Sequence, residues 1–489
     1  MTTSRRTFIR NSAITTASLA LRSTSGANPL IGRASSPENG PLVGIQIDSH
    51  SLFDEGINKV LDVLQEQGQV NTLFLAVFTF DTATGGRSSP YPGHGNRDAG
   101  KVFHGGNFAT PHEQYYRNTV LRDVKAPEYP DRDILAEVIP ETRKRGMKVY
   151  AWDYNVFRRD TPNIEQLEEE DVDGNKANTL CAFNPNYRNF ITGLVEDQFR
   201  SYDLDGAMWG DEHQGPFDNA IDATIQRMTV TCFCKYHCDE ARKRGIDPDR
   251  AKEGYRKLIA LVAQDKQGVK PTDGYFVSFW RLCVEYPELL AWEKLWNDGK
   301  YSTFKAIYDT AKKVRNSAQI GFHIWHTASF SPFFRAEQNF AEFATYADFL
   351  KPVLYNECAG NRDANFLNNM HSAIFGDPSV DELYQMQNEM LGYAEKPLQD
   401  VMKEGFSSDY VFRETKRTLD DVQGKCKVYP GIGVDIPNKF GSTPERVYDA
   451  TLAAFRAGAQ GVIFSREYAE MHNENLAGGG RAIQKIRSK

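Results

Sequence analysis

The sequence predicts a (β/α)8 barrel, in which eight parallel strands alternate with helices. Eight short apolar runs, rich in β-branched residues, each end in polar or charged residues, and stretches with helical spacing lie between them. Strands buried on both faces have this continuous apolar character, and their alternation with helices implies a parallel sheet. No Gly-x-Gly-x-x-Gly follows the first run, which disfavours a doubly wound open sheet as the alternative.

The eight expected strands follow one another along the whole chain. They are Val43–Asp48, Leu73–Phe80, Lys148–Val156, Gly206–Glu212, Ile320–His326, Phe349–Glu357, Lys427–Asp435 and Gly461–Tyr468. Helices are expected at Glu55–Glu66, Arg132–Lys144, Tyr187–Tyr202, several places between Thr231 and Arg315, Ala336–Tyr346, a block from Val380 to Asp421, and Pro444–Ala457. Asn184-Pro185 and Thr443-Pro444 each supply an N-cap followed by proline, which marks a helix start.

Two connections are too long to be simple loops. Thr82 to Tyr129 follows the second strand and is rich in Gly, Pro, Asn and His, whereas Asp218 to Asn316 follows the fourth strand and has a largely helical pattern. In a barrel, both would rise from the C-terminal rim, where the loops after strands build the active site. We therefore expect one catalytic barrel over residues 37–489, with long insertions after strands two and four.

The first 36 residues have the features of an export signal. Arg5-Arg6 is followed by Phe8 and by the weakly apolar stretch Ala13–Leu21, and no acidic residue occurs before Glu38. This pattern resembles a bacterial twin-arginine signal. The apolar stretch is shorter than the roughly 20 residues of a membrane span. We expect a cleaved signal peptide and linker at 1–36, the twin-arginine export machinery as a partner, a periplasmic or secreted protein, and no stable membrane anchor.

Composition excludes two broad classes of protein. The chain carries 58 Lys+Arg against 65 Asp+Glu, a net charge of −7, with no clustered basic stretch of the kind that binds nucleic acid. A mean hydropathy of −0.54 excludes a multi-span membrane protein. Aromatic residues make up 12% of the chain, which suits stacking on sugars as well as a large core.

The seven cysteines are an odd number, so a complete disulfide framework is impossible. Cys232, Cys234, His237 and Cys238 form the one local cluster, and these are residue types that bind zinc. No second pair of ligands accompanies them, so a local disulfide or a buried packing turn are the alternatives. We assign no metal and no other cofactor from the sequence.

Carboxylates, imidazoles and indoles gather at the ends of the expected strands. The catalytic candidates are Asp211, Glu212, Glu357 and Asp435. The candidates for substrate binding are Asp48, His50, Trp152, Asp153, Asn155, Trp209, His213, His323, Trp325, His326, Tyr355, Asn356, Arg466 and Glu467. For any one of them, helix capping or rim packing is the alternative, and an ion pair between Arg466 and Glu467 is one such packing role.

Paired carboxylates beside aromatic surfaces are what glycoside hydrolysis needs. One carboxylic acid protonates the leaving oxygen, while a second carboxylate attacks the anomeric carbon or activates water. The joint occurrence of such side chains at eight strand ends therefore predicts a glycoside hydrolase acting on an oligo- or polysaccharide.

Residues 181–240 resemble a group of bacterial (β/α)8 proteins classed by analogy as glycoside hydrolases. An Asn-Pro segment in Cys181–Arg188 opens a helix, a Tyr-Asp-Leu-Asp-Gly turn at Tyr202–Gly206 leads into the fourth strand, and Asp211-Glu212 closes it before Cys232-Phe-Cys234. The resemblance implies a carbohydrate substrate and one catalytic carboxylate at Asp211 or Glu212. The second carboxylate is then Glu357 or Asp435. Related barrels often carry Glu on both strands four and seven, whereas strand seven here ends in Asp435.

Two other functions remain open from the sequence. A metal-dependent sugar isomerase or hydrolase would use the carboxylates and imidazoles of the rim as ligands. A non-catalytic carbohydrate-binding barrel would keep the aromatic and polar rim without a correctly spaced acid pair. A chelator distinguishes the metal-dependent enzyme from a glycoside hydrolase. Variants that change the carboxylates to amides distinguish the binding barrel, which should keep its affinity, from a hydrolase, which should lose turnover.

Overall fold

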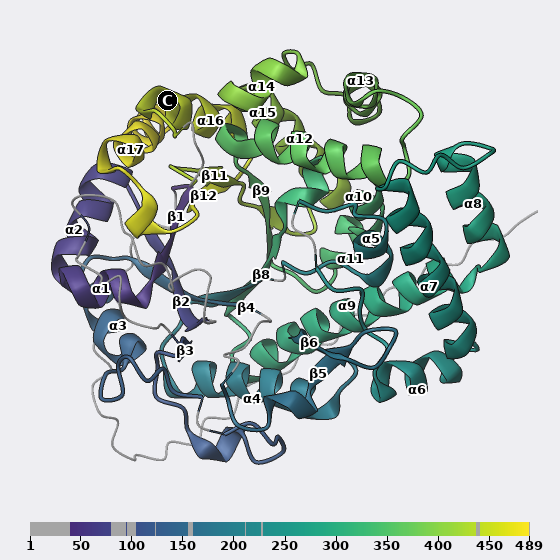
Figure 1. The fold of residues 1–489 in the computed structure, drawn as a ribbon. Coiled ribbons are helices and arrows are strands. Elements are labelled where there is room, and N and C mark those ends of the chain that lie inside the picture. The colour runs from purple at the N-terminus through teal and green to yellow at the C-terminus, as the bar shows by residue number, and fades with distance from the viewer. Residues whose placement is uncertain are drawn as a thin grey trace, which may run out of the picture. The chain divides into compact units, whose positions relative to one another are not determined.

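The strands of the main sheet close into a barrel. The computed structural model describes residues 40–79, 94, 104–122, 124–154, 160–210, 212–225, 228–436 and 441–488. The barrel strands in order are β1 (Leu42–Asp48), β2 (Thr72–Thr79), β4 (Lys148–Tyr154), β7 (Gly206–Gly210), β8 (Gln319–Ile324), β9 (Phe349–Leu354), β10 (Lys427–Val428) with β11 (Gly431–Gly433), and β12 (Gly461–Ser465). Each is parallel to the next, and β12 returns to β1, with Val43 opposite Val462 (Figure 1).

The predicted fold class is confirmed, because each of the eight apolar runs contains one barrel strand. The seventh strand is split into β10 and β11 around Pro430. Proline has no N–H for the ladder, so a break in pairing is expected there. The sixth run was predicted to stay extended to Glu357, but β9 ends at Leu354 and a helix begins at Asn356. Acidic residues favour the first turn of a helix, which accounts for the change at Glu357.

Helices surround the barrel and follow its strands. Those on the barrel wall are α1 (Ser49–Glu55), α2 (Ile57–Gly68), α3 (Ile134–Lys144), α4 (Pro185–Ser201), α9 (Glu288–Val314), α10 (Pro332–Glu337), α11 (Phe340–Phe343), α12 (Asn356–Ala373), α15 (Ser408–Val422), α16 (Pro444–Ala457) and α17 (Asn473–Arg487). The two predicted caps are present: the Asn184 side chain accepts from Asn186 N, and that of Thr443 accepts from Arg446 N.

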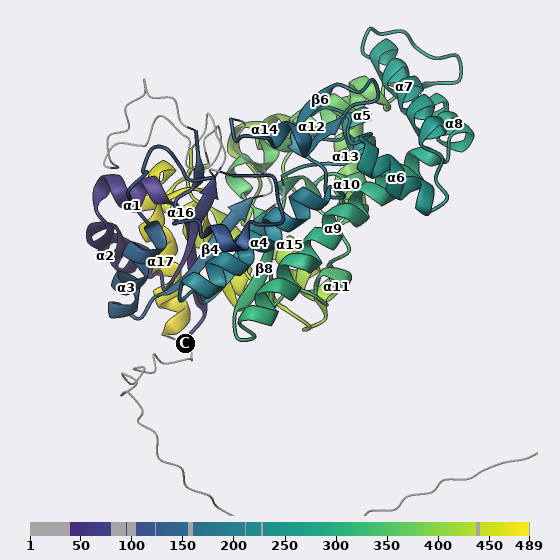
Figure 2. The same cartoon turned by 90° about the horizontal axis from the view of Figure 1, so that it is seen from below.

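The connections carry further elements. After β7 the chain forms α5 (Pro216–Ala220), α6 (Lys235–Lys243), α7 (Pro248–Asp265) and α8 (Tyr275–Glu285) before α9. In Figure 2, α6, α7 and α8 lie together to one side of the barrel. A hairpin of β5 (Glu168–Glu170) and β6 (Lys176–Leu180), which the sequence pattern did not predict, precedes α4. The remaining elements are β3 (Gly106–Asn107), which pairs with β2, and the helices α13 (Val380–Leu391) and α14 (Leu398–Glu404). Four short 3-10 helices complete the described part: η1 (Glu113–Tyr115), η2 (Ile164–Gln166), η3 (His326–Ser329) and η4 (Tyr468–Glu470).

The lumen of the barrel is filled by aromatic rings toward the amino ends of its strands. Phe74 and Tyr150 lie 5.1 Å apart between ring centroids, and Phe349 and Tyr429 lie 5.2 Å apart. Glycines on other strands make room for them: a Cβ on Gly321 would lie 2.4 Å from the Phe349 ring. This packing makes the lumen a core rather than a pore, so chemistry is confined to the carboxyl ends of the strands.

The expected signal peptide at 1–36 and residues 82–93, 95–103 and 123 of the insertion after β2 lie outside the described residues. Among the residues that are described, no helix is both long enough and apolar enough to span a bilayer.

Candidate active site

A buried lysine lies at the centre of the lumen, where β9 directs the Lys351 side chain inward. Lys351 Nζ donates to Gln46 Oε1 at 2.7 Å and to the Tyr355 hydroxyl at 3.0 Å, and it lies 3.2 Å from His323 Nδ1. Ser465 Oγ donates to the same Gln46 oxygen at 2.6 Å. Four strands, β1, β8, β9 and β12, are therefore joined by one polar network across the barrel.

The network sets the charge state of its members. Burial lowers the pKa of Lys351 well below its ordinary value, with the Glu212 carboxylate opposing that shift. Burial, together with the charge of Lys351, lowers the pKa of His323 to about 4. His323 is thus a neutral imidazole at neutral pH, and with Nδ1 turned to Lys351 its Nε2 faces the carboxylate at the end of β7.

Glu212 is the open carboxylate of the rim. It follows β7, its side chain is 43% exposed, and its Oε1 lies 3.4 Å from His323 Nε2. Burial at the mouth of the barrel acts to raise the pKa of Glu212, but hydrogen bonding to His323 and the positive charges of Arg362 and Lys351 outweigh it and lower the pKa overall. The site therefore presents an ionised carboxylate to solvent.

Aromatic side chains line the lumen beside Glu212. The rings of Trp152 and Tyr154 on β4 lie 5.2 Å apart, and Tyr154 contacts the His323 ring edge-on at 6.0 Å. Tyr355 faces the same space from the end of β9, with the Arg362 guanidinium 6.0 Å from its ring centroid. All three rings are buried, so Glu212 is the exposed group above an aromatic floor.

Glu357 has the opposite electrostatic character. It lies in the first turn of α12, buried against β11, where a Cβ on Gly433 would come within 2.0 Å of its carboxylate, and Ile436 N donates to its Oε1 at 3.4 Å. Burial raises the pKa of Glu357 to about 7. The positive charge of Arg362 acts to lower the pKa of both Glu357 and Glu212.

Asp435 has a dense set of hydrogen bonds to the backbone and to a neighbouring helix. Its carboxylate accepts from His472 N at 2.8 Å, from Asn475 Nδ2 at 2.8 Å and from Ser442 N at 3.3 Å, while its own φ is 58°. These contacts tie the end of β11 to the start of α17. The structure thus places Asp435 as an anchor of the rim.

Arg466 and Glu467, the candidates for substrate binding on the eighth strand, do not form the ion pair that was the alternative for them. Arg466 Nε lies 3.1 Å from Glu470 Oε2 instead. Glu467 is buried, where it accepts from Ser51 Oγ at 3.0 Å and from Ala469 N at 3.2 Å. Glu467 Oε1 thus caps the turn that carries Glu470, while its Oε2 is buried without a hydrogen-bond partner among the described residues, and Arg466 pairs one turn further on.

Asp153, Trp209 and Trp325 lie in the barrel wall. Asp153 alternates with the inward-facing Trp152 and Tyr154, and its carboxylate accepts from Phe78 N and Gln198 Nε2, each at 2.9 Å. Burial raises the pKa of Asp153 to about 7. Trp209 and Trp325 are buried in the main hydrophobic core, where Trp325 packs edge-on against Phe334.

The predicted histidines separate into different surroundings. His326 Nδ1 lies 2.9 Å from Arg362 and its Nε2 lies 3.0 Å from the Tyr410 hydroxyl. His50 packs edge-on against Phe108 and Tyr129. His213 turns away from the lumen to a cavity of about 30 Å³ that Glu169 and Trp296 also line.

Of the other predicted residues, Asp48 is buried at the end of β1, and the Asn356 side chain donates to Phe406 O. Asp211 and Asn155 lie outside the described residues.

Sequence reasoning missed the residues that organise the site. Lys351 lies inside the apolar run of the sixth expected strand, so it does not stand out as a site residue. A lysine between Leu350 and Pro352 in a buried strand nevertheless indicates a buried polar contact. Gln46 and Ser465 carry no comparable signal. Arg362 lies within α12, beyond the strand end at which functional residues were sought.

We predict that Asp435→Ala lowers the free energy of unfolding by roughly 3 kcal/mol, because a buried charged acceptor of three hydrogen-bond donors is lost. The positive φ at this position adds to the cost, since alanine adopts that region less readily than Asp or Asn. Asp435→Asn keeps one acceptor oxygen and the backbone preference, so it should cost clearly less. Urea unfolding of both variants measures the difference, and equal losses would contradict the anchoring role.

Comparisons with known proteins agree with the fold. No protein-family model and no curated protein matches this chain. The β-galactosidase from the psychrophilic Marinomonas ef1 has a TM-score of 0.51 at 11% identity, with 91% of this chain and 59% of that chain covered. A polyextremophilic β-galactosidase from the Antarctic haloarchaeon Halorubrum lacusprofundi has a TM-score of 0.51 at 13% identity, with 92% and 58% covered.

A third solved structure is the PgaB (BpsB) glycoside hydrolase domain from Bordetella bronchiseptica, with a TM-score of 0.47, 11% identity, and 91% of this chain and 98% of that chain covered. The chain spans less than two thirds of the length of the two β-galactosidase chains. At such identities the likeness concerns the fold alone, a closed barrel of parallel strands surrounded by helices.

Proposed function

We propose that the chain is a glycoside hydrolase that cleaves an oligo- or polysaccharide at the carboxyl end of the barrel. The observation that carries the proposal is the pair of carboxylates with opposed pKa shifts, Glu212 and Glu357, on which the same Arg362 charge acts. Glycoside hydrolysis needs one ionised and one protonated carboxyl group at neutral pH, and environments that push two pKa values apart supply them.

The roles follow from the two environments. Glu212, ionised and open to solvent, is the carboxylate that attacks the anomeric carbon or activates water. Glu357, with a pKa of about 7, is the acid that protonates the leaving oxygen. Trp152, Tyr154 and Tyr355 are buried and form the aromatic packing beside this carboxylate, while His323 and Lys351 hold Glu212 in place. Asp211, next to Glu212 in the sequence, is the reserve candidate for the second carboxylate.

The carbohydrate substrate would be met outside the cytoplasm. The proposal includes export through the twin-arginine pathway, supported by Arg5-Arg6 and the apolar stretch that follows. Replacing both arginines by lysine should leave the chain in the cytoplasm, and unchanged secretion of that variant would refute the export proposal.

The first experiment is a screen of the purified chain on a broad panel of glycans and aryl glycosides. Release of reducing sugar or of the aryl group from at least one sugar is expected. Binding of a glycan without release of any product would favour the non-catalytic carbohydrate-binding barrel. Activity that disappears with a chelator and returns with a divalent ion would favour the metal-dependent barrel.

A further inference from the structure

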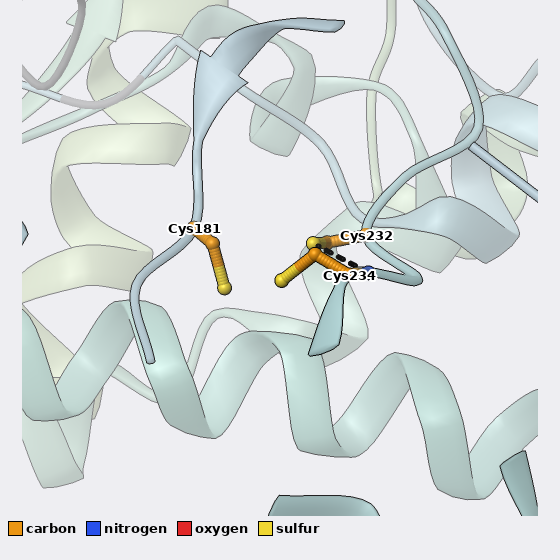
Figure 3. A group of neighbouring side chains, drawn as sticks. All are labelled: Cys181, Cys232 and Cys234. Atoms are coloured by element: carbon orange, nitrogen blue, oxygen red, sulfur yellow. Dashed lines mark hydrogen bonds between the residues drawn. The ribbon is translucent and has the colours of Figure 1, made fainter. Parts of the chain in front are cut away.

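Three cysteines from two distant segments meet outside the lumen. The Sγ atoms of Cys181, Cys232 and Cys234 all lie within 4.8 Å of one another, and all three residues are buried (Figure 3). Cys181 lies between β6 and α4, whereas Cys232 and Cys234 come directly before α6. Across the described ranges, this is the one group of His, Cys, Asp and Glu side chains that converges closely enough to hold an ion.

We propose that these three thiols bind a Zn²⁺ ion, with His237 as the fourth ligand. Zinc–sulfur bonds of about 2.3 Å in tetrahedral geometry put neighbouring sulfurs about 3.8 Å apart, so the thiols need to approach by no more than about 1 Å. Three cysteines and one histidine are a common set for structural zinc. Binding releases the thiol protons to solvent and leaves thiolates on the ion.

The backbone around the cysteines suits anionic sulfur. Cys234 N donates to Cys232 Sγ at 3.4 Å, the contact drawn in Figure 3. Cys234 is also the N-cap residue of α6, where the helix dipole favours negative charge. Phe183, Tyr236 and Trp296 pack around the three thiols and exclude water from them.

His237 is the proposed fourth ligand; its ring nitrogens lie outside the group of atoms within 4.8 Å of one another, so its side chain must move to reach the ion. His237 lies three residues after Cys234, in the first turn of α6, where side chains point back toward the start of the helix. The residue is buried, and its Nε2 has no hydrogen-bond partner among the described residues. A buried imidazole nitrogen without a partner is costly unless a ligand satisfies it.

A buried glutamate already ties the two cysteine segments together. Glu169 accepts from Thr179 Oγ1 at 2.7 Å and from Thr231 Oγ1 at 2.6 Å. Thr179 lies two residues before Cys181, and Thr231 lies directly before Cys232. Trp296 Nε1 donates to its other oxygen at 3.1 Å. The segments are thus held in place without any bond between the sulfurs, as in a preorganised site.

The set differs from the cluster that the sequence suggested. Cys238 Sγ donates to Phe233 O at 3.3 Å and takes no part, while Cys181, more than fifty residues away in sequence, replaces it. A disulfide could join only two of the three sulfurs and would leave the third beside it, whereas one ion engages all of them. Cys238 therefore provides a matched control for substitution.

The test measures metal, so it does not depend on the proposed hydrolase activity. The full chain is purified, supplied with Zn²⁺, dialysed and analysed by elemental mass spectrometry. About one zinc per chain is expected for the parent and for Cys238→Ser, and less than about a tenth for Cys181→Ser and Cys234→Ser. His237→Gln should bind zinc at least about tenfold more weakly, and unchanged affinity would overturn its assignment.

Because a buried serine can unfold the chain, the parent protein supplies a second measurement. Replacement of zinc by Co²⁺ should give the absorption of tetrahedral cobalt thiolate, and removal of the ion by phenanthroline should lower the Tm. A parent chain that takes up no zinc would overturn the proposal. So would peptide mapping that shows a disulfide between any two of the three cysteines.

Discussion

Glu212→Gln is expected to lower kcat on the best glycan of the panel by at least about a thousandfold. A carboxylate that activates water as a general base contributes a factor of about 10²–10⁴ to the rate, and a carboxylate that attacks the anomeric carbon as a nucleophile contributes more. Loss of Glu212 removes that contribution. Glutamine keeps the size of the side chain and its distance from His323, but it has no charge to give. The measurement is steady-state release of reducing sugar, with circular dichroism to show that the fold is kept.

The partner variant separates the two carboxylates by their chemistry. Glu357→Gln removes the proposed acid, so natural glycosides with poor leaving groups should be cleaved far more slowly. Aryl glycosides with activated leaving groups need no such proton and should retain much of their rate, whereas Glu212→Gln should lose both. Glu445→Gln, at a side chain exposed on α16, is the control for an added amide.

Two outcomes would contradict this assignment. If Glu212→Gln keeps activity within about tenfold of the parent, a loss below the general-base range, Glu212 is not the attacking or activating carboxylate. If Asp211→Asn then shows the large loss, the ionised role belongs to Asp211. If both Glu357→Gln and Glu212→Gln lose activity only on substrates with poor leaving groups, the proposed division of roles between the two carboxylates is wrong.

The barrel could be predicted from the sequence because its signal is repeated eight times. Each apolar run corresponds to a strand, and Asn184 and Thr443 cap the helices that their side chains indicated. The ends of the strands were harder to predict. The sixth expected strand extends to Glu357, whereas β9 ends at Leu354 and α12 begins at Asn356. Strand number depends on the whole pattern, while a strand end depends on two or three residues.

The site was harder to predict because its residues are distinguished by whether their side chains point into the lumen or into the barrel wall. Residues at strand ends alternate between lumen and wall, so Trp152 faces inward and the adjacent Asp153 faces α4. A shift of one residue reverses that assignment. Asp435 and Glu467 have suitable chemistry at suitable places, yet backbone donors bind both oxygens of Asp435 and Oε1 of Glu467. Only the three-dimensional pairing with those donors distinguishes an anchor from a reactive group.

Arg362→Met is expected to move the whole pH–rate profile to higher pH. The positive charge of Arg362 lowers the pKa of Glu212, which must be ionised and so sets the acid limb. The same charge lowers the pKa of Glu357, which must be protonated and so sets the alkaline limb near pH 7. Removing the charge raises both pKa values, so both limbs shift in the same direction.

Arg362→Lys is the matched control, because it keeps the charge and loses the planar guanidinium that contacts His326 Nδ1 at 2.9 Å. A lysine variant with an unshifted profile and a methionine variant with both limbs raised would establish an electrostatic role. If the methionine variant instead lowers kcat at every pH without moving either limb, Arg362 acts only by packing. If a single limb moves, one of the two carboxylates lies outside the reach of Arg362, and the pairing of Glu212 with Glu357 fails even if hydrolysis itself is found.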